Sequence, residues 1–453
     1  MNHFDIAVLG GGPGGYVAAI CAAKLGKSVA LIEKRELGGT CLNRGCIPTK
    51  ALLHSADLYH EMKEAASLGI LVDKLSFDYE KITQRKENVV KKLRMGVAGL
   101  MKGNHISVFS TEGTLVDAHT LKVGEETLTA ARIILAMGSF PAALPISGIE
   151  SAKNSDDVLA MRELPKSAVI IGGGVIGVEF ATLLSSLDVK VTIVEMAPQI
   201  LPGTDEEIAA SMRKILEKKG VAIHTGAKVL AVEEGKACLF ELDGQQQRAM
   251  GDMVIVAVGR KPATANIGLE NIGITLERGF VKVDEELRTS VDGVYAIGDI
   301  TGKMQLAHVA SAQGLVAAHN ACGEHRRMRY DIVPSCIYTS PEIASVGLTQ
   351  TQARDKGIEV KMGSFPLAAN GRSSIMNVTE GVAKIVTDAR TGEILGAQLM
   401  APRATDMIGE IAAVMRSEGT IEELSDTIHA HPTVSEIIME AAHDVHHQSC
   451  HKL

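Results

Sequence analysis

A strand, a glycine-rich loop and a helix occur twice in this chain with the same internal spacing. In the first copy a short apolar strand leads into the loop at residues 10–15, and the next strand ends at Glu33. In the second copy the loop is at residues 172–177, and the next strand ends at Glu195. The acidic residue follows the first glycine by 23 positions in both copies (10 to 33, 172 to 195). The pattern G-x-G-x-x-G is formed by Gly10, Gly12, Gly15, Gly172, Gly174 and Gly177.

One G-x-G-x-x-G pattern is weak evidence, but its position between a strand and a helix, with an acidic residue about 20 positions later, is typical of dinucleotide binding. The glycines let the backbone approach a pyrophosphate, which the N–H groups and the dipole of the helix N-terminus bind. We expect Glu33 and Glu195 to accept hydrogen bonds from ribose hydroxyls. Two such sites indicate two dinucleotides that exchange electrons, and the alternative is two glycine-rich turns without a ligand.

Glu195 also predicts which nicotinamide coenzyme binds at the second loop. Its carboxylate would repel the 2′-phosphate of NADP, which an arginine nearby would have to neutralise. The next arginine along the chain is Arg213, well beyond the end of the strand. The sequence therefore favours NAD over NADP.

Composition supports a multidomain enzyme of ordinary globular character. The chain has 453 residues, which suggests about three domains, and 46% of them are hydrophobic. A net charge of −8 and the absence of Trp give no reason to expect nucleic-acid binding, and no apolar stretch is long enough to predict a membrane helix. The N-terminus lacks the pattern of a secretory signal, and seven cysteines, an odd number, favour a reducing compartment such as the cytoplasm.

We predict an α/β fold with two Rossmann-like dinucleotide-binding domains and a C-terminal α+β domain. From about residue 334 the pattern changes to alternating strands followed by an apolar helix at residues 404–418. This change predicts a separate domain that is built differently from the two glycine-loop units.

Two cysteines stand five positions apart directly after the first unit. Cys41 and Cys46 open a probable helix, and in an ideal helix five residues rise about 7.5 Å and rotate to different faces. A disulfide between them therefore requires a distorted turn, which Gly45 and Pro48 allow. Such a bridge would be easily reduced, and a helix N-terminus would lower the thiol pKa. The alternatives are a zinc site, which lacks a second cysteine pair, and two unreactive thiols.

Two further motifs contain side chains that could serve such chemistry. Asp299 directly follows a buried strand, where it could bind a ribityl hydroxyl or simply mark the end of the strand. In the segment 429–436, Pro432 fixes the backbone after His431, and Glu436 is within reach to orient the imidazole. A lone histidine is more often a satisfied surface or core residue, so the residues alone leave the role of this pair open.

The combination of these motifs resembles the flavin-dependent disulfide reductases, the pyridine nucleotide-disulfide oxidoreductases. The matching stretches are Gly38–Lys50, the two glycine loops, Tyr295–Asp299 and His429–Glu436. The resemblance implies four regions, namely an FAD-binding domain (1–144), an NAD-binding domain (145–263), a central domain (264–331) and an interface domain (332–453). It also implies a homodimer in which His431 of one subunit faces the cysteine pair of the other.

The resemblance assigns a role to each matching residue. It implies that Cys41 exchanges with the substrate sulfur, that Cys46 faces the flavin, that His431 is the acid/base, and that Glu436 orients His431. It places Lys50 near the flavin N5 with Glu179 paired to it. The implied FAD site comprises Gly10, Gly12, Gly15, Glu33, Lys50, Gly113, Ser139, Asp299 and Ala307. The implied NAD site comprises Gly172, Gly174, Gly177, Glu179, Glu195 and Gly259.

Within this family the resemblance is strongest to the members that oxidise dihydrolipoamide with NAD+. It implies a lipoyl domain of an acyltransferase or of a glycine cleavage carrier protein as the partner, with no nucleic acid, membrane or metal involved. The alternative is another disulfide reductase, similar to glutathione or mercuric reductase. The former uses NADPH, which Glu195 disfavours, and the latter has two adjacent cysteines at the C-terminus, where this chain has only Cys450.

The C-terminal tail is rich in histidine. His443, His446, His447 and His451 lie close to Cys450. We expect a solvated, frayed terminus, and a metal-binding tail is the alternative.

Overall fold

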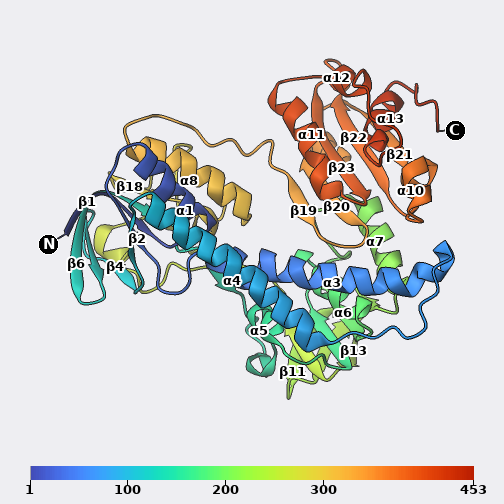
Figure 1. Ribbon diagram of the computed structural model, residues 1–453, viewed down its shortest axis with the longest axis horizontal. Helices are drawn as coiled ribbons and strands as arrows, with labels where there is room; N and C mark the ends of the chain where they lie inside the picture. Colours follow the sequence, from blue (N-terminus) through green and yellow to red (C-terminus); the bar gives the residue numbers. More distant parts are fainter. Residues whose placement is uncertain (1, 453) are drawn as a thin grey trace.

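The computed structural model describes residues 2–452, and its three largest sheets, two of them mainly parallel and one antiparallel, are each covered by helices (Figure 1). In the first sheet the parallel strands run in the order β3-β2-β1-β6-β18, and β5 and β4 extend it in antiparallel fashion beside β6. The strands are β1 (Asn2–Leu9), β2 (Val29–Ile32), β3 (Ser107–Phe109), β4 (Gly113–Leu115), β5 (Thr120–Val123), β6 (Glu126–Leu135) and β18 (Val294–Ala296). The central strands are apolar on both faces, which is the pattern of a buried parallel sheet.

The segment after residue 263 returns to this first sheet. It contributes β18 and the helix α8 (Ala307–Ala321), which packs along α1 (Pro13–Lys24). The two helices approach closely, because a Cβ on Gly314 would lie 2.5 Å from the carbonyl oxygen of Gly14. The first unit is therefore built from two stretches of chain that are far apart in the sequence.

The second sheet repeats the strand order of the first. Its four parallel strands run in the order β10-β9-β8-β14, and a three-stranded antiparallel sheet, β11-β12-β13, packs against them. The strands are β8 (Ser167–Ile171), β9 (Lys190–Val194), β10 (Ala222–His224), β11 (Lys228–Glu233), β12 (Ala237–Leu242), β13 (Gln245–Met250) and β14 (Met253–Val256). The helices of this unit are α6 (Val175–Ser186) and α7 (Glu206–Lys218). A short pair, β7 (Ser139–Pro141) and β15 (Arg260–Pro262), joins it to the first unit.

The C-terminal region forms the predicted α+β unit. Its five antiparallel strands run in the order β19-β20-β23-β22-β21. They are β19 (Ser335–Ile337), β20 (Glu342–Gly347), β21 (Val360–Pro366), β22 (Val382–Asp388) and β23 (Ile394–Ala401). The helices α11 (Ala404–Arg416) and α13 (Glu436–Asp444) cover the sheet and share one apolar core with it. The predicted fold class is confirmed.

Two long helices connect the units. α3 (Cys46–Glu64) and α4 (Tyr79–Gly103) run side by side across the middle of the molecule (Figure 1). α3 also packs on α6 of the second unit, so its N-terminus lies where the first and second units meet. Among residues 2–452 no helix has the length and apolar character needed to cross a membrane.

The C-terminal tail is docked, so the expectation of a frayed end is wrong. Ser449 and His451 bond to the buried Glu440 carboxylate at 2.6 Å each, and Lys452 bonds to Ser364 and Asp444. Among residues 2–452, no three or more His, Cys, Asp or Glu side chains are grouped as a metal site requires. Two of the tail histidines pair with carboxylates of the C-terminal unit instead, His446 with Glu422 and His451 with Glu440.

Candidate active site

The two glycine loops have the same backbone geometry. A Cβ on Gly15 would lie 1.8 Å from the carbonyl oxygen of Gly10, and a Cβ on Gly177 would lie 1.9 Å from that of Gly172. No side chain can be tolerated at such a distance, so each helix can begin directly behind its strand only because glycine stands there. The helix N-termini consequently point at the edge where a pyrophosphate would lie.

The two glutamates hold the loops in shape. Glu33 accepts N–H bonds from Gly11 at 2.7 Å and from Arg35 at 2.8 Å. Glu195 accepts the equivalent bonds from Gly173 at 2.5 Å and from Ala197 at 2.6 Å. Each carboxylate oxygen has a second lone pair, so a ribose hydroxyl can still bind. The predicted ribose ligands therefore also fix the loops that would bind the pyrophosphate.

The structure brings together Ser139, at the start of β7, and Asp299, which follows β18 of the first unit. The Ser139 hydroxyl donates to the Asp299 carboxylate at 2.5 Å. Arg260 donates to the Ser139 hydroxyl and carbonyl at 2.7 Å each, and its Nε lies 3.9 Å from Asp299. Arg260 directly follows Gly259 of the second unit, so this network links the two units.

The other residues implied for the dinucleotide sites lie at strand and helix ends. Gly113 begins β4, and a Cβ there would lie 2.8 Å from Leu9 and 2.9 Å from Ile32, so the chain passes closely over the carboxyl ends of β1 and β2. Ala307 is the first residue of α8, which places it at a helix N-terminus. Gly259 has a φ of +104°, a conformation that favours glycine, in the turn between β14 and β15.

The cysteine pair lies in the distorted turn that the sequence predicts. α2 (Gly39–Arg44) ends after Cys41, and α3 begins at Cys46. At the break between them, a Cβ on Gly45 would lie 2.9 Å from the Thr40 carbonyl oxygen and 3.2 Å from the Cα of Cys41. The absence of that side chain lets the two free thiols lie close enough for each to shift the pKa of the other.

The environment distinguishes the two thiols. A hydrogen bond from Cys41 lowers the pKa of Cys46, and the nearby Lys50 ammonium lowers it further. Burial raises this pKa but is outweighed, so the pKa of Cys46 is below its usual value. The same hydrogen bond, together with burial, raises the pKa of Cys41. Cys46 therefore carries the negative charge when the reduced pair ionises, which suits a thiolate that donates electrons.

Lys50 and Glu179 form the predicted pair. The Lys50 ammonium lies 2.9 and 2.8 Å from the two carboxylate oxygens of Glu179, which is only 4% exposed. Tyr338 of the C-terminal unit donates its backbone N–H to Glu179 at 3.1 Å, and its ring lies under the Lys50 ammonium, 4.4 Å from nitrogen to centroid. The pair thus joins α3, α6 and β19–β20, so three units meet beside Cys46.

His431 and Glu436 also form the predicted pair, but away from the cysteines. His431 Nδ1 lies 2.8 Å from Glu436 Oε1, and Thr433 donates its N–H to the other oxygen at 2.8 Å. Burial raises the pKa of Glu436, but the bonds from Thr433 and His431 outweigh it, and the pKa is lowered. His431 is 79% exposed on its side chain, and Glu436 is its one hydrogen-bond partner within residues 2–452.

Three residues near the site are not assigned by sequence reasoning. Arg260 and Tyr338 act across units, as described above. Asn43, between the two cysteines, donates its amide to the carbonyls of Leu37 and Gly39 at 3.0 Å each and so holds the preceding loop. Its position inside the cysteine motif is a signal that could have identified it, whereas the contacts of Arg260 and Tyr338 depend on tertiary structure.

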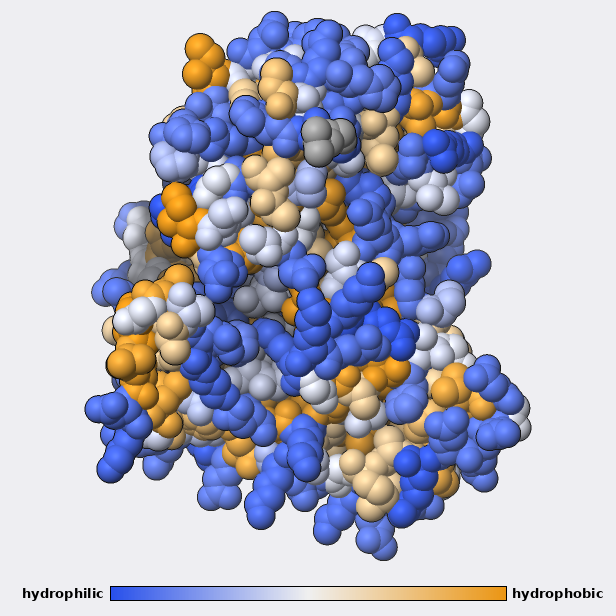
Figure 2. Space-filling model, turned by 90° about the vertical axis from the view of Figure 1, so that its right-hand side faces the viewer, coloured by the Kyte–Doolittle hydropathy of each residue, from blue (hydrophilic) through white to orange (hydrophobic). Residues whose placement is uncertain are grey.

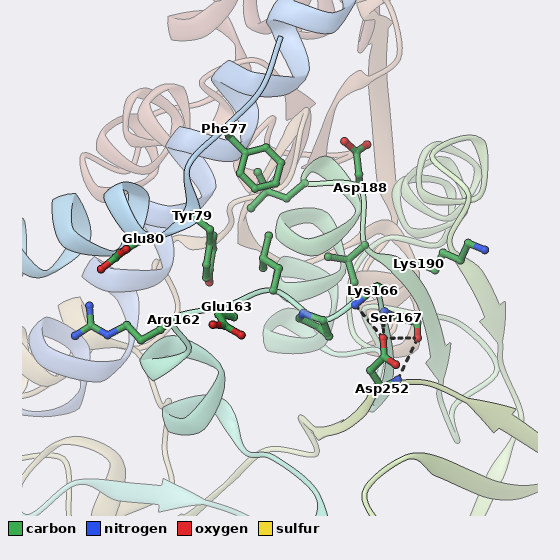
Figure 3. Close-up of a pocket in the computed structure, with 14 residues that line it drawn as sticks. Phe77, Tyr79, Glu80, Arg162, Glu163, Lys166, Ser167, Asp188, Lys190 and Asp252 are labelled. Carbon is green, nitrogen blue, oxygen red and sulfur yellow. Dashed lines mark hydrogen bonds between the residues drawn. The ribbon is translucent and has the colours of Figure 1, made fainter. Parts of the chain in front are cut away.

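A separate cavity of about 1190 Å³ lies at the other end of the second sheet (Figure 3). Its walls include Phe77, Tyr79 and the amino ends of β8 and β9, and Asp252 there accepts the backbone N–H bonds of Lys166 and Ser167. Ligands of open parallel sheets bind beyond the carboxyl ends of the strands, where the glycine loops are. This cavity is therefore distinct from the coenzyme site.

The geometry can now be compared with known proteins. Residues 4–314 match the family described as pyridine nucleotide-disulphide oxidoreductase, and residues 333–442 match the dimerisation domain of the same family. The chain belongs to this family. Dihydrolipoyl dehydrogenase of Bacillus subtilis is 42% identical to it, over 97% of this chain and 95% of the relative. Dihydrolipoyl dehydrogenase of Chlamydia muridarum is 44% identical, over 98% of this chain and 97% of the relative.

Solved structures show the same architecture. The HOCl-induced flavoprotein disulfide reductase RclA from Escherichia coli, solved as a Cu(II) complex, superposes with a TM-score of 0.88 at 32% identity, over 98% of this chain and 99% of RclA. The predictions of an oxidoreductase enzyme with FAD and NAD as cofactors are confirmed. The glycine loops fit these groups, because Gly12 and Gly174 stand directly before the first residues of α1 and α6 and carry no side chain where a pyrophosphate would approach the backbone.

Proposed function

We propose that the chain oxidises protein-bound dihydrolipoamide to lipoamide and reduces NAD+ to NADH, the reaction of a dihydrolipoyl dehydrogenase. The observation that carries this proposal is the placement of the segment with the thiol pair. Gly39 at its start packs on Gly12 of the first loop, where a Cβ on Gly39 would lie 2.6 Å from the Gly12 Cα. Lys50 at its end binds Glu179 on the helix of the second loop. The thiols are thus held between two dinucleotide units, in a chain 42% and 44% identical to two dihydrolipoyl dehydrogenases.

The thiol pair accepts electrons by exchange in this proposal. The pair begins as a disulfide, and a substrate thiolate attacks the Cys41 sulfur while Cys46 leaves as a thiolate. The sulfur of the second substrate thiol then attacks the substrate sulfur bonded to Cys41 while its proton passes to the departing Cys41 sulfur, so lipoamide forms and Cys41 is released as a thiol. The lowered pKa of Cys46 makes it the better leaving group. FAD, when bound, supplies the path by which a hydride reaches NAD+.

His431 acts as the acid/base that removes the proton from the substrate thiol. Glu436 fixes Nδ1 of the imidazole, so Nε2 is left to take the proton. Glu195 binds the coenzyme ribose and selects NAD+ over NADP+. The implied contacts of Gly113, Ser139, Asp299 and Ala307 belong to the FAD site, and Gly259 belongs to the NAD site. In this proposal residues 1–144 bind FAD, 145–263 bind NAD, 264–331 form the central domain and 332–453 form the interface domain.

The catalytic site is completed by a second copy of the chain. His431 is exposed and makes no hydrogen bond to either cysteine among residues 2–452, whereas chemistry requires it next to Cys41. Ile428, three residues before it, is 96% exposed, so this segment offers an apolar side chain to a partner next to His431. A homodimer that places His431 of one subunit at the thiols of the other resolves both features. The reducing compartment proposed for such a thiol pair is the cytoplasm.

Mixed dimers test this arrangement. A Cys41→Ser subunit paired with a His431→Gln subunit puts both defects into one shared site and leaves the other intact. Such heterodimers should retain about half of the wild-type activity per dimer. Almost no activity would mean that each site lies within one subunit, and the proposed arrangement would be wrong.

The substrate is tested by anaerobic titration of the yellow holoenzyme. Dihydrolipoamide, presented free or on a lipoyl domain, should reduce the flavin, and NADH should reduce it from the other side. Glutathione should have little effect at the same concentration. Reduction by glutathione with NADPH turnover, and none by dihydrolipoamide, would favour the glutathione reductase alternative instead.

A further inference from the structure

A buried lysine joins the interface domain to the second glycine-loop unit. Lys384 lies on β22 and is only 7% exposed, yet its ammonium points out of the antiparallel sheet into the neighbouring unit. It lies 2.9 and 2.8 Å from the two carboxylate oxygens of Asp205 and 3.1 Å from Glu207. Burial lowers the pKa of Lys384, but the two carboxylates outweigh it and the pKa is raised, so the residue is held as a cation. In Figure 1, α7, which begins next to Asp205, lies beneath this domain.

Asp205 ends the loop that begins at Glu195. This coenzyme loop, residues 195–205, returns to the glycine motif, because Leu201 donates its N–H to the Gly173 carbonyl at 2.7 Å. A Cβ on Gly173 would lie 3.1 Å from the Ile200 side chain, so the loop packs directly on the glycines. Leu201 has a φ of +51°, a strained conformation for leucine that the surroundings must maintain.

The two ends of the coenzyme loop are therefore fixed differently. Glu195 fixes the first end through the backbone of its own unit, whereas Asp205 at the second end is held by Lys384 of another unit. Asp205 also caps α7 by accepting the N–H groups of Glu207 and Ile208. Removing one member of a buried ion pair leaves the other charge uncompensated, so the end of the loop would have to move towards water.

We propose that Lys384 is a positioning residue for the coenzyme: by holding Asp205, it keeps the strained coenzyme loop closed on Gly173 and so maintains the NAD site. The inference rests on the proposed role of Glu195 at the coenzyme ribose. The interface domain would then have two functions: it carries His431, and through Lys384 it supports the NAD site.

The test uses two variants, each of which removes one charge of the Lys384–Asp205 ion pair. Lys384→Met removes the cation, and Asp205→Asn removes the anion but keeps a good helix cap. Each should raise KM for NAD+ on the order of tenfold, a typical coupling between linked sites, with kcat nearly unchanged. The rate of anaerobic flavin reduction by dihydrolipoamide should stay at the wild-type value, because that step does not involve the coenzyme loop. Lys384→Arg should restore most of the NAD+ affinity.

A matched control exists on the same helix. Lys218 also pairs with the interface domain, 2.7 Å from Glu380, but both side chains are more than half exposed. Lys218→Met should therefore leave KM for NAD+ unchanged. In the double variant Lys384→Met/Asp205→Asn the two effects on KM should be clearly less than multiplicative, because both act through one contact.

Three results would overturn the inference. The first is an unchanged KM for NAD+ in Asp205→Asn, which decides the matter even if Lys384→Met does not fold. The second is an equal loss in the dihydrolipoamide half-reaction, which would indicate a general structural role. The third is an equal effect of Lys218→Met. Glu195→Gln separates this inference from the proposed site: if that variant also leaves KM for NAD+ unchanged, the assignment of the coenzyme ribose is wrong, whatever Lys384 does.

Discussion

The two glycine-loop units share one internal design but differ in what surrounds them. In both, a glutamate 23 positions after the first glycine accepts two backbone N–H bonds, and a glycine at the helix start is pressed against a carbonyl oxygen. In the first unit, other elements cover the loop: Gly39 of α2 packs on Gly12, and a Cβ on Gly14 would lie 2.9 Å from the Ala310 carbonyl oxygen of α8. In the second unit, no other element of residues 2–452 lies within 4 Å of a Cβ on Gly174.

We propose that this difference lets one duplicated unit serve two purposes, with FAD at the first loop and NAD+ at the second. The residues next to the second loop are open to solvent, with Val175 at 42% and Met196 at 75% exposure. A dinucleotide under cover of α2 and α8 would leave slowly, as a resident FAD must, whereas one at the open loop can exchange in every turnover, as NAD+ must. In the proposed assignment, the surrounding elements, and not the loops themselves, decide between a prosthetic group and a substrate.

The largest effect is expected when each glycine loop is blocked in turn. Gly15→Ala and Gly177→Ala each place a methyl group within 2 Å of a carbonyl oxygen, so either loop must lose its geometry. Gly15→Ala should yield colourless protein with no activity. Gly177→Ala should remain yellow and be reduced by dihydrolipoamide, yet fail to transfer electrons to NAD+. Flavin absorbance per chain and the two half-reactions measure this, and equal loss of FAD in both variants would contradict the assignment.

His431→Gln separates the thiol side from the coenzyme side. Glutamine cannot hold the proton at neutral pH, and a positioned acid/base is worth about 10²–10⁴-fold in rate. Reduction of the flavin by dihydrolipoamide should slow by about this factor, whereas reduction by NADH should change far less. His446→Gln, a change of the same type beside Glu422 in the same domain, serves as the control. Equal slowing of both half-reactions would indicate misfolding or lost FAD.

Glu33→Gln and Glu195→Gln change the equivalent glutamate in each of the two units, so their effects on FAD and NAD+ can be compared directly. In each glutamine one acceptor oxygen becomes an NH₂ group that faces a backbone N–H donor, and the loss of a hydrogen bond to a charged group corresponds to about 10- to 100-fold in affinity. Glu195→Gln should raise KM for NAD+ by about this factor and weaken the preference over NADP+. Glu33→Gln should affect only FAD retention, measured by dialysis. A Glu195→Gln enzyme with unchanged KM and coenzyme preference would remove Glu195 from the ribose site.

The smallest expected effect concerns the thiol pair. Because the Cys41 hydrogen bond lowers the pKa of Cys46, Cys41→Ala should raise that pKa towards the usual value for a thiol. In the reduced enzyme, alkylation of Cys46 by iodoacetamide rises with pH as the thiolate forms, and in Cys41→Ala the rise should occur at higher pH. Mass spectrometry of the labelled peptide over a pH series measures it, and an unchanged profile would mean that Cys41 does not stabilise the thiolate.

The sequence predicts the features that are local. The spacing of Gly10 to Glu33 and of Gly172 to Glu195 predicts two strand–loop–helix units, and Gly45 predicts the break that brings the cysteines together. It does not predict that the glutamates bind their own loops through backbone N–H groups. These bonds form only if β2 and β9 end beside the glycine loops, and the register of each sheet, not the residue type, decides where the strands end.

The features that the sequence does not predict depend on contacts between distant segments. In the sequence Arg260 looks like an ordinary turn residue after a strand, and only the pairing of β15, which it begins, with β7 brings it to Ser139 and Asp299. Lys384 follows an alternating strand pattern and looks like a surface lysine until β22 is seen against Asp205. The tail likewise looks frayed in the sequence, because only the structure shows that Glu440 on α13 is buried and accepts bonds from Ser449 and His451.

The central claim, a covered loop for FAD and an open loop for NAD+, is tested most directly by stoichiometry. The purified protein is equilibrated with FAD and NAD+, the bound amounts are measured by equilibrium dialysis, and the sample is then passed through a desalting column and measured again. The account predicts about one FAD and one NAD+ per chain at equilibrium, and one FAD but almost no NAD+ after the column. Retention of both, loss of both, or binding of NAD+ only where FAD is absent would contradict it.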